Sequence, residues 1–238
     1  MIKIERSEII CIIPARGGSK GLKKKNLQKV NNKKLIKYPI EYALKSKLVG
    51  TILVSTDDRN IADVAKKAGA LVPFLRPKNI SGDFATTEET LKHALLTYEN
   101  LIKKKFKICI FLTCTDIFRQ KEWIKKGILI LKKNSKIDSV FVGNKTHKNF
   151  WERTKKTGWK RLKNRMKTYS SRQVSDYIIR EDTGLFCASR AELWRKGMRI
   201  GDKVEVIVND DTFSGIDIHN LKDLRLANLA MKIFNEKK

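Results

Sequence analysis

Residues 9–26 read IICIIPARGGSKGLKKKN, an unbroken apolar run followed by a loop rich in glycine and lysine. The run at 9–13 predicts a β-strand that is buried on both faces, as in a parallel sheet. Downstream, short apolar segments alternate with amphipathic ones, and this alternation favours a mostly parallel sheet with helices on both faces. The stretch therefore indicates an α/β protein whose first strand leads into a candidate ligand loop.

The other elements follow from the hydrophobic period and from residues that suit helix ends. We expect further strands at 51–55, 70–75, 108–112, 139–142, 184–188 and 204–208. We expect helices at 35–47, 60–68, 86–103, 121–132, from about 190 onward, and at 221–234. Asp57 and Asp58 suit the start of the second helix and Gly69 its end, while Thr86 or Thr87 suits the start of the third.

The alternation of strand-like and helix-like segments stops between about 144 and 173, where the chain is polar and basic and its hydrophobic residues show no clear period. A long irregular insertion in a compact domain is usually functional, as a lid or an oligomerisation arm. We therefore expect residues 1–238 to form a single domain, with an insertion at about 144–173.

Lys and Arg number 52 against 25 Asp and Glu, which gives a net charge of +27. A basic surface is typical of nucleic-acid-binding modules, but these lysines are spread along the whole chain. We therefore interpret the charge first as a plain solvated surface, next as a preference for anionic small substrates, and only as a remote alternative as nucleic-acid binding. Hydrophobic residues at 41% suffice for a core. No apolar run approaches the roughly 18 residues of a membrane span, and the N-terminus makes a poor secretion signal.

The chain has four cysteines, none in a C-x-x-C pair, and three widely separated histidines. This spacing does not suit a zinc site. Three of the cysteines lie in apolar runs, so we expect reduced core thiols and a cytoplasmic protein.

The loop at 14–26 follows the first strand, at the end of the sheet where open α/β proteins bind ligands. Its glycines leave backbone N–H groups free to approach a phosphate, and Arg16 and Lys20 add positive charge. It has neither the G-x-x-x-x-G-K-[ST] spacing of a P-loop nor the G-x-G-x-x-G spacing of a dinucleotide turn. These residues indicate a nucleotide-phosphate site, with a plain glycine-rich turn as the alternative.

Several motifs in this order resemble the acylneuraminate cytidylyltransferases, the CMP-sialic acid synthetases. They are IPARGGSKG at 13–21 with KN at 25–26, VSTDD at 54–58, PFLRP at 73–77, DFATT at 83–87, and GIDI at 215–218 with DL at 223–224. The resemblance is strong over residues 9–95, patchy in the middle and recognisable again from about Arg172. The related Kdo cytidylyltransferases lack the GGSKG form of the loop, which favours the sialic acid branch.

The resemblance implies a three-layer nucleotidyltransferase fold, with the insertion serving as a protruding dimerisation arm in a homodimer. It implies that CTP and a nine-carbon 2-keto acid sugar give a CMP-sugar and pyrophosphate, with Mg²⁺ (or Mn²⁺) assisting. The anomeric hydroxyl would attack the α-phosphorus. Catalysis would then rest on positioning and charge neutralisation rather than on a protein nucleophile.

The resemblance also implies residue roles. Arg16 and Lys20 would hold the triphosphate, and Asp217 matches a metal-associated carboxylate, so these three are the catalytic candidates. Taken alone, Arg76 suits a surface loop, Thr87 a helix cap and Asp217 the cap of the last helix. The implied nucleotide-binding residues are Ala15, Arg16, Gly17, Gly18, Ser19, Lys20, Asn26, Arg76 and Thr87.

Three segments depart from the family pattern. The family's Asp-x-Asp is here Asp217-Ile218-His219, which makes His219 a further metal candidate and would favour Mn²⁺. In Leu112–Arg119, which replaces LQPTSPLR, Thr113 stands where a Gln would touch the sugar, and Asp116 adds a carboxylate for the sugar or the metal. Residues 172–173 and 180–184 match only loosely. The sugar therefore stays open, as do transfer to another sugar acid, use of another nucleotide, and CTP binding without turnover.

Overall fold

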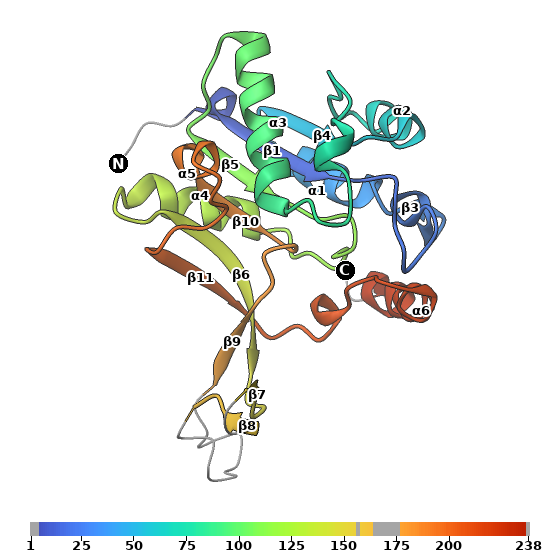
Figure 1. Ribbon diagram of the computed structural model, residues 1–238, viewed down its shortest axis with the longest axis vertical. Helices are drawn as coiled ribbons and strands as arrows, with labels where there is room; N and C mark the ends of the chain where they lie inside the picture. The colour runs from blue at the N-terminus through green and yellow to red at the C-terminus, as the bar shows by residue number, and fades with distance from the viewer. Residues whose placement is uncertain (1–4, 156–157, 164–176, 237–238) are drawn as a thin grey trace.

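The computed structural model describes residues 5–155, 158–163 and 177–236. Seven strands form its central sheet in the order β11-β6-β10-β5-β1-β4, with β9 also paired to β6 (Figure 1). Strands β4, β1, β5, β6 and β11 run in one direction, while β10 and β9 run against them. The predicted mostly parallel sheet is confirmed. The bounds are β1 (Ile9–Pro14), β4 (Thr51–Ser55), β5 (Ile108–Phe111), β6 (Ser139–Thr146), β9 (Ile178–Glu181), β10 (Cys187–Arg190) and β11 (Val204–Asn209).

Helices cover both faces of this sheet, so the predicted three-layer fold is confirmed. One core joins the sheet to α1, α2, α4 and α6, and a second core joins it to α3 and α5. In the parts of the chain that are described, no helix has the length and apolar character needed to cross a membrane. The helices are α1 (Lys37–Ser46), α2 (Arg59–Lys67), α3 (Thr87–Ile102), α4 (Trp123–Lys133), α5 (Ala191–Arg195) and α6 (Leu221–Glu236).

Strand β1 divides the two cores and fixes the ligand end of the sheet. Its side chains alternate, with Ile9, Cys11 and Ile13 in the first core and Ile10 and Ile12 in the second. The chain reaches β4 through α1 on one face and β5 through α3 on the other face. The strand order therefore reverses at β1, and such a switch point is where open α/β sheets bind ligands.

Local signals at the helix ends behave as predicted. Asp58 caps α2 by accepting a hydrogen bond from the Ile61 N–H at 3.0 Å. Thr86 caps α3 in a capping box, because its hydroxyl accepts from the Glu89 N–H at 3.1 Å while the Glu89 carboxylate accepts from the Thr86 N–H at 2.8 Å. Gly69 follows the end of α2 with a φ of +95°.

Two predicted strands are wrong in extent. At 70–75 only Leu71 forms a bridge, to Leu53, because Pro73 has no N–H with which to continue a ladder. The strand expected at 184–188 is β10, which begins at Cys187, since the preceding residues turn through a hydrogen bond from the Leu185 N–H to the Asp182 carbonyl at 3.0 Å. An unpredicted hairpin joins β2 (Lys29–Val30) to β3 (Lys33–Lys34).

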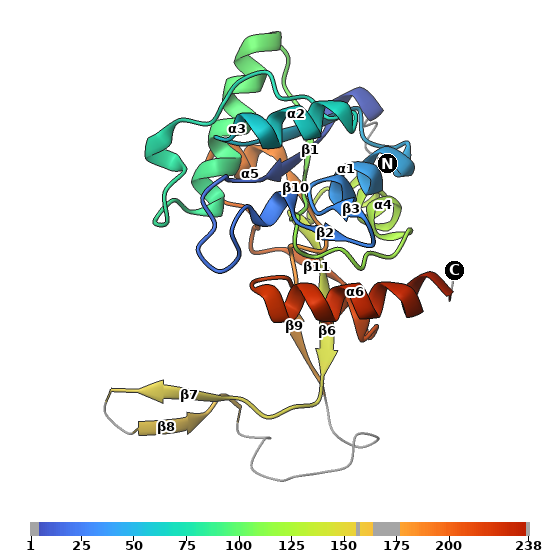
Figure 2. The same ribbon diagram turned by 90° about the vertical axis from the view of Figure 1, so that its right-hand side faces the viewer.

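The expectation of irregular structure at 144–173 is wrong for the described residues. Strand β6 continues to Thr146 and pairs with β9, and β7 (Trp151–Thr154) pairs with β8 (Gly158–Arg161) as a hairpin. Figures 1 and 2 show that these strands project from the body as an arm. Both faces of β7 and β8 are largely exposed, so their sequence carries no apolar alternation. Residues 164–173, with Arg172 and Gln173, lie outside the described residues.

A buried ion pair joins α3 to α5 across the second core. Glu99 is 6% exposed, and its carboxylate accepts from Arg195 Nε at 3.0 Å and Nη2 at 2.7 Å. The same carboxylate accepts from the Phe106 N–H at 2.8 Å. Removal of Glu99 would therefore leave the Phe106 N–H without its acceptor, and the Arg195 guanidinium without its counter-charge, with its Nη2 still donating to the Phe106 carbonyl at 2.7 Å.

We expect Glu99→Ala to lower the free energy of unfolding by about 3–5 kcal/mol, because it leaves the largely buried Arg195 guanidinium without its carboxylate partner. Urea denaturation at neutral pH measures this. Asp63→Ala removes an exposed carboxylate from α2 and should change the free energy by no more than about 0.5 kcal/mol. A loss for Glu99→Ala as small as for Asp63→Ala would contradict the structural role of the pair.

Candidate functional site

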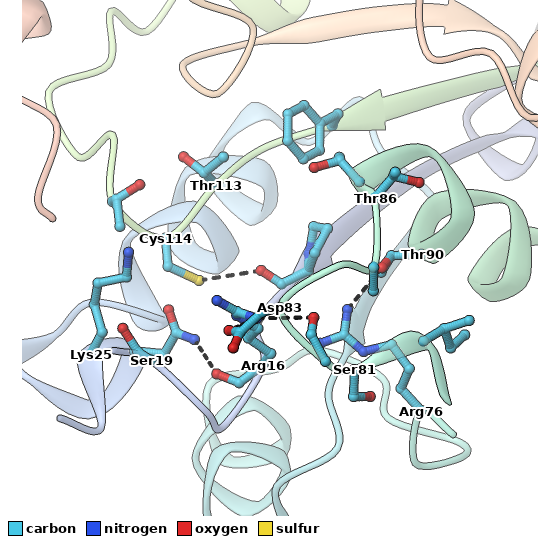
Figure 3. Close-up of a pocket in the computed structure, with 18 residues that line it drawn as sticks. Arg16, Ser19, Lys25, Arg76, Ser81, Asp83, Thr86, Thr90, Thr113 and Cys114 are labelled. Carbon is cyan, nitrogen blue, oxygen red and sulfur yellow. Dashed lines mark hydrogen bonds and ion pairs between the residues drawn. The ribbon is translucent and has the colours of Figure 1, made fainter. Parts of the chain in front are cut away.

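A cavity of about 290 Å³ lies at the carboxyl ends of β1 and β5 (Figure 3). Its volume is close to the lower end of the roughly 300–1,000 Å³ range of ligand pockets. Three segments form it: the loop after β1, the residues after β5, and the stretch from Arg76 to the first turn of α3. Its polar lining consists of Arg16, Ser19, Lys25, Asn26, Arg76, Ser81, Asp83, Thr86, Thr87, Thr90, Thr113 and Thr115.

Arg76 supplies a buried guanidinium to this cavity. The residue is 6% exposed, its Nη1 donates to the Thr90 hydroxyl at 3.0 Å, and its Nη2 lies 3.8 Å from Asp57 Oδ1. Its Nε and Nη2 are buried and have no hydrogen-bond partner among the described residues. Burial lowers the pKa of Arg76, and the Asp57 carboxylate opposes that shift. Unsatisfied buried donors beside a cavity favour a ligand that brings hydrogen-bond acceptors.

The loop after β1 is fixed from three directions. The Asn26 side chain donates to the Arg16 carbonyl at 2.9 Å, and Asp57 accepts from the Gly17 N–H at 2.8 Å. Any Cβ on Gly21 would lie 2.6 Å from the His219 carbonyl oxygen, so the segment before α6 packs directly on the loop. The expectation that the loop's N–H groups are free is therefore wrong for Gly17, whose N–H is already bonded.

Arg16 and Lys20 converge on one carboxylate. Arg16 Nη1 lies 3.0 Å from Asp83 Oδ1, and Lys20 Nζ lies 2.6 Å from Asp83 Oδ2. The hydrogen bond from Lys20 is the main reason that the pKa of Asp83 is lowered, and Arg16 adds to it. The two predicted triphosphate cations thus meet at a point where they already hold an anionic group.

A second group of polar residues surrounds Asp116. The Thr113 hydroxyl donates to Asp116 Oδ2 at 2.5 Å, and a Cβ on Gly184 would lie 2.1 Å from the same oxygen. Burial, and then the charge of Asp217, raises the pKa of Asp116 to about 6. Two carboxylates therefore lie near enough to repel each other, and the Arg119 guanidinium opposes this effect on the pKa of Asp116 only in part.

Asp217 and His219 form a pair beside this group. His219 Nε2 lies 2.7 Å from Asp217 Oδ2, while Asp217 Oδ1 is buried and lacks a hydrogen-bond partner within the described ranges. Residues 216–219 belong to no helix or strand, and the two side chains that the sequence indicates as metal candidates lie next to each other. No set of three or more His, Cys, Asp or Glu side chains suited to a metal occurs in the described part of the chain.

The structure thus brings together part of the predicted site. Arg16, Ser19, Asn26, Arg76, Thr87 and Thr113 line the cavity. Ala15, Gly17, Gly18 and Lys20 lie in the loop outside that lining, as do Asp116, Asp217 and His219 in the neighbouring segments. Their roles stay predictions.

Sequence reasoning missed several residues that the cavity uses. The sequence indicates Asp57 only as the start of a helix, whereas in the structure it holds both Gly17 and Arg76. The sequence suggests no separate role for Thr90 or Asp83, and Cys114, one of the four buried free cysteines, lines the cavity. The position of Asp57 two residues after β4, at the ligand end of the sheet, is the signal that could have identified it.

The fold is that of an α/β protein with a cavity at the switch point of its sheet, and comparison with known proteins identifies its family. The family model described as cytidylyltransferase matches residues 10–205. The chain is 28% identical over 227 residues to a flagellin modification protein, "Post-translational flagellin modification protein B", of Campylobacter coli, covering 95% of this chain and 96% of that protein. Among solved structures, a CMP:2-keto-3-deoxy-manno-octonic acid synthetase complexed with CTP matches with a TM-score of 0.67 at 14% identity, over 94% of this chain and 98% of the other.

Two further relatives match over shorter stretches. Pseudaminic acid cytidylyltransferase of Campylobacter jejuni serotype O:2 is 45% identical over 86 residues, 36% of this chain and 37% of that protein. The CMP-N,N'-diacetyllegionaminic acid synthase of the same strain is 43% identical over 104 residues, 44% of each chain. These matches span less than half the length of either enzyme.

The chain belongs to the cytidylyltransferase family and is a nucleotidyltransferase. Its resemblance to the acylneuraminate cytidylyltransferases is confirmed.

The raised pKa of Asp116 predicts how stability depends on pH. Folded Asp116 has a pKa of about 6, against about 3.9 for an unfolded Asp. The folded protein therefore binds the proton more tightly, and stability falls as pH rises from about 4 through about 6. In chelator without added metal, we expect Asp116→Asn to be about 1–3 kcal/mol more stable than the natural chain at pH 8, and to lose that margin at pH 4. Thermal unfolding at the two pH values measures this, and an equal difference at both would contradict it.

Proposed function

We propose that this cytidylyltransferase transfers CMP from CTP to a nonulosonic, sialic-acid-like sugar acid and releases pyrophosphate. Arg76 carries the proposal, because its buried Nε and Nη2 have no hydrogen-bond partner in the described structure. Cytosine presents two neighbouring acceptors, O2 and N3, on the edge that such a fork of donors suits. Uracil replaces the second acceptor with an N–H, so this guanidinium favours a cytosine base. The cavity's position beside the phosphate loop supports the same orientation of the nucleotide.

The triphosphate would lie along the loop after β1. Arg16 and Lys20 already hold the Asp83 carboxylate, at 3.0 and 2.6 Å, and phosphate oxygens would take its place as acceptors. The anomeric hydroxyl of the sugar acid gives its proton to the solvent and attacks the α-phosphorus, so that a new P–O bond forms. The bond from the α-phosphorus to the bridging oxygen breaks, and pyrophosphate leaves with that oxygen. Arg16 and Lys20 stabilise the charge that builds up on the leaving pyrophosphate. The packing of Gly21 on His219 keeps the loop in place during this step.

Asp217 is the proposed residue for a divalent cation, Mg²⁺ or Mn²⁺, with Asp116 as its neighbour. The residues fit such an ion, because Asp217 Oδ1 is buried with no hydrogen-bond partner in the described part of the chain and the charge of Asp217 raises the pKa of Asp116. Mg²⁺ sites of this kind need only one or two carboxylates, since substrate phosphates supply other ligands. When bound, the cation would neutralise phosphate charge. His219 would orient Asp217 through Oδ2 and leave Oδ1 to the metal.

The proposed sugar substrate is a class of compounds, the nonulosonic acids. The relatives named for pseudaminic and legionaminic acids support a nonulosonic acid. We place the sugar near Thr113, which lines the cavity, and its neighbour Asp116, which lies outside the lining. The Thr113 hydroxyl is already hydrogen-bonded to Asp116. A sugar hydroxyl would therefore contact the hydrogen-bonded pair of Thr113 and Asp116 rather than either residue alone.

We further propose a homodimer formed through the arm, in the cytoplasm. Trp151 and Trp159 are 48% and 65% exposed, and their register opposite Arg161 and Arg153 puts all four on one face of the hairpin. Exposed aromatic and Arg side chains of this kind are typical of interfaces. Light scattering should give twice the chain mass of 27.4 kDa. The four free, buried cysteines support a reducing compartment.

We expect Lys20→Ala to lower kcat/KM for pyrophosphate release at least about tenfold with CTP and a nonulosonic acid, because a charge-assisted phosphate contact is lost. Lys23→Ala removes an exposed lysine from the same loop and should stay within twofold of the natural chain. Both should unfold at the same temperature. Activity of Lys20→Ala equal to that of Lys23→Ala would contradict the phosphate role of the loop.

The metal role of Asp217 predicts a separate effect. Asp217→Asn should lose at least about 99% of Mg²⁺-supported turnover while binding CTP in chelator within twofold of the natural chain. His219→Asp should raise Mg²⁺-supported activity if His219 takes the place of a carboxylate ligand, and should lower it if His219 orients Asp217 as proposed. Unchanged turnover in Asp217→Asn would place the metal elsewhere, with Asp116 the next candidate.

A further inference from the structure

A second cavity, of about 470 Å³, lies between α1, α6 and the segment that precedes α4. It shares no lining residue with the nucleotide cavity, and we call it the α1–α6 cavity. Its walls are aromatic and aliphatic, built from Tyr38, Tyr42, Ile117, Met231 and Phe234. A cavity of this size and lining is suited to a small molecule with an apolar body.

The polar part of the lining is positive. Lys33, Lys45, Arg119 and Lys121 line the cavity, with Glu41 as the single acidic residue found there in the described structure. Four cationic side chains and one carboxylate leave three positive charges. Lys33 Nζ lies 2.6 Å from Glu41 Oε2, so this pair is already neutralised. The remaining charge comes from Lys45, Lys121 and Arg119.

Arg119 lines the cavity with an almost wholly buried side chain. The residue is 4% exposed, and its Nε donates to the Leu185 carbonyl at 2.6 Å. Its Nη2 donates to the carbonyls of Thr113 at 2.7 Å and Gly184 at 2.8 Å. Its Nη1 is buried with no hydrogen-bond partner among residues 5–155, 158–163 and 177–236. A buried guanidinium nitrogen without an acceptor is costly, and an anionic ligand would remove that cost.

The two tyrosines contribute ring faces rather than free hydroxyls. The Tyr38 hydroxyl donates to the Val30 carbonyl at 2.6 Å, and the Tyr42 hydroxyl donates to the Gln120 carbonyl at 2.7 Å. The Arg119 guanidinium carbon lies 5.6 Å from the centre of the Tyr42 ring. These bonds fix the rings as walls, so the groups that can select a ligand by charge are the cations.

We propose that the α1–α6 cavity binds a small organic anion, with a flat aromatic or short aliphatic body between the rings and one carboxylate or sulfonate toward Arg119, Lys45 and Lys121. The site is separate from the nucleotide cavity and does not depend on the proposed reaction. Because Arg119 also holds the carbonyls of Thr113 and Gly184, it connects this site to the residues beside Asp116.

The aromatic sulfonate 8-anilinonaphthalene-1-sulfonate is the probe. The natural chain should bind one equivalent of the probe with a Kd of roughly 10–100 μM, an affinity that suits the size of the probe. Saturating CTP should not displace the probe. The double variant Lys45→Glu, Lys121→Glu should weaken binding at least about tenfold. The matched control Lys105→Glu, Lys133→Glu makes the same charge change at exposed sites elsewhere and should bind within twofold.

A second variant and a competition complete the test. Met231→Trp fills the cavity and should abolish binding, with far-UV circular dichroism and nucleotide binding used to check the fold. Benzoate should displace the probe, whereas benzyl alcohol, which has the same ring without the charge, should not. Equal probe binding in the two double variants, displacement by CTP, or equal competition by benzyl alcohol would each overturn the proposal.

Discussion

The burial of β1 on both faces is the constraint on which the rest of the structure depends. Its side chains alternate between two cores, so a shift of one residue in register would exchange every contact on both faces. The strand ends at Pro14, which lines the cavity at the carboxyl ends of β1 and β5, and the Ala15 N–H donates to the Ser55 carbonyl at 2.9 Å. The proposed phosphate loop therefore begins at a point that the whole sheet holds in place.

The positively charged side chains of this protein fall into two groups, solvated lysines and buried arginines. Most lysines are solvated and contribute little that is specific. The two most buried guanidinium groups, Arg76 and Arg119, behave differently, because each bonds to nearby main chain or side chains and still keeps a nitrogen without a partner in the described structure. Each lies at a cavity. We therefore infer that ligand selectivity in this basic protein depends on a few desolvated cations rather than on its net charge.

Local features of this protein could be predicted from its sequence. The apolar run at 9–13, the capping residues Asp58 and Thr86, and the glycine-rich loop each carry their signal within a few residues. Strand β4 matches its predicted bounds, and α3 matches within a residue or two, for the same reason. The hairpin of the arm gave no such signal, since neither of its faces packs on a core.

The contacts that form the site could not be predicted, because they join residues far apart in the chain. Gly17 and Asp57 are separated by 40 residues, and Arg16 and Asp83 by 67. The packing of Gly21 on the His219 carbonyl brings the N-terminal and C-terminal parts of the chain together. The motifs indicated that these segments belong to one site, whereas their pairing required the folded structure.

We infer that the buried Arg76 beside the proposed phosphate loop selects cytosine. Calorimetric titration of CTP and of UTP, without the sugar acid, tests it most directly when Arg76→Lys is compared with the natural chain. We predict that the natural chain binds CTP at least about tenfold more tightly than UTP, and that Arg76→Lys loses this preference because an ammonium lacks the fork of donors. Equal affinities in the natural chain, or an unchanged preference in a folded Arg76→Lys, would contradict the account.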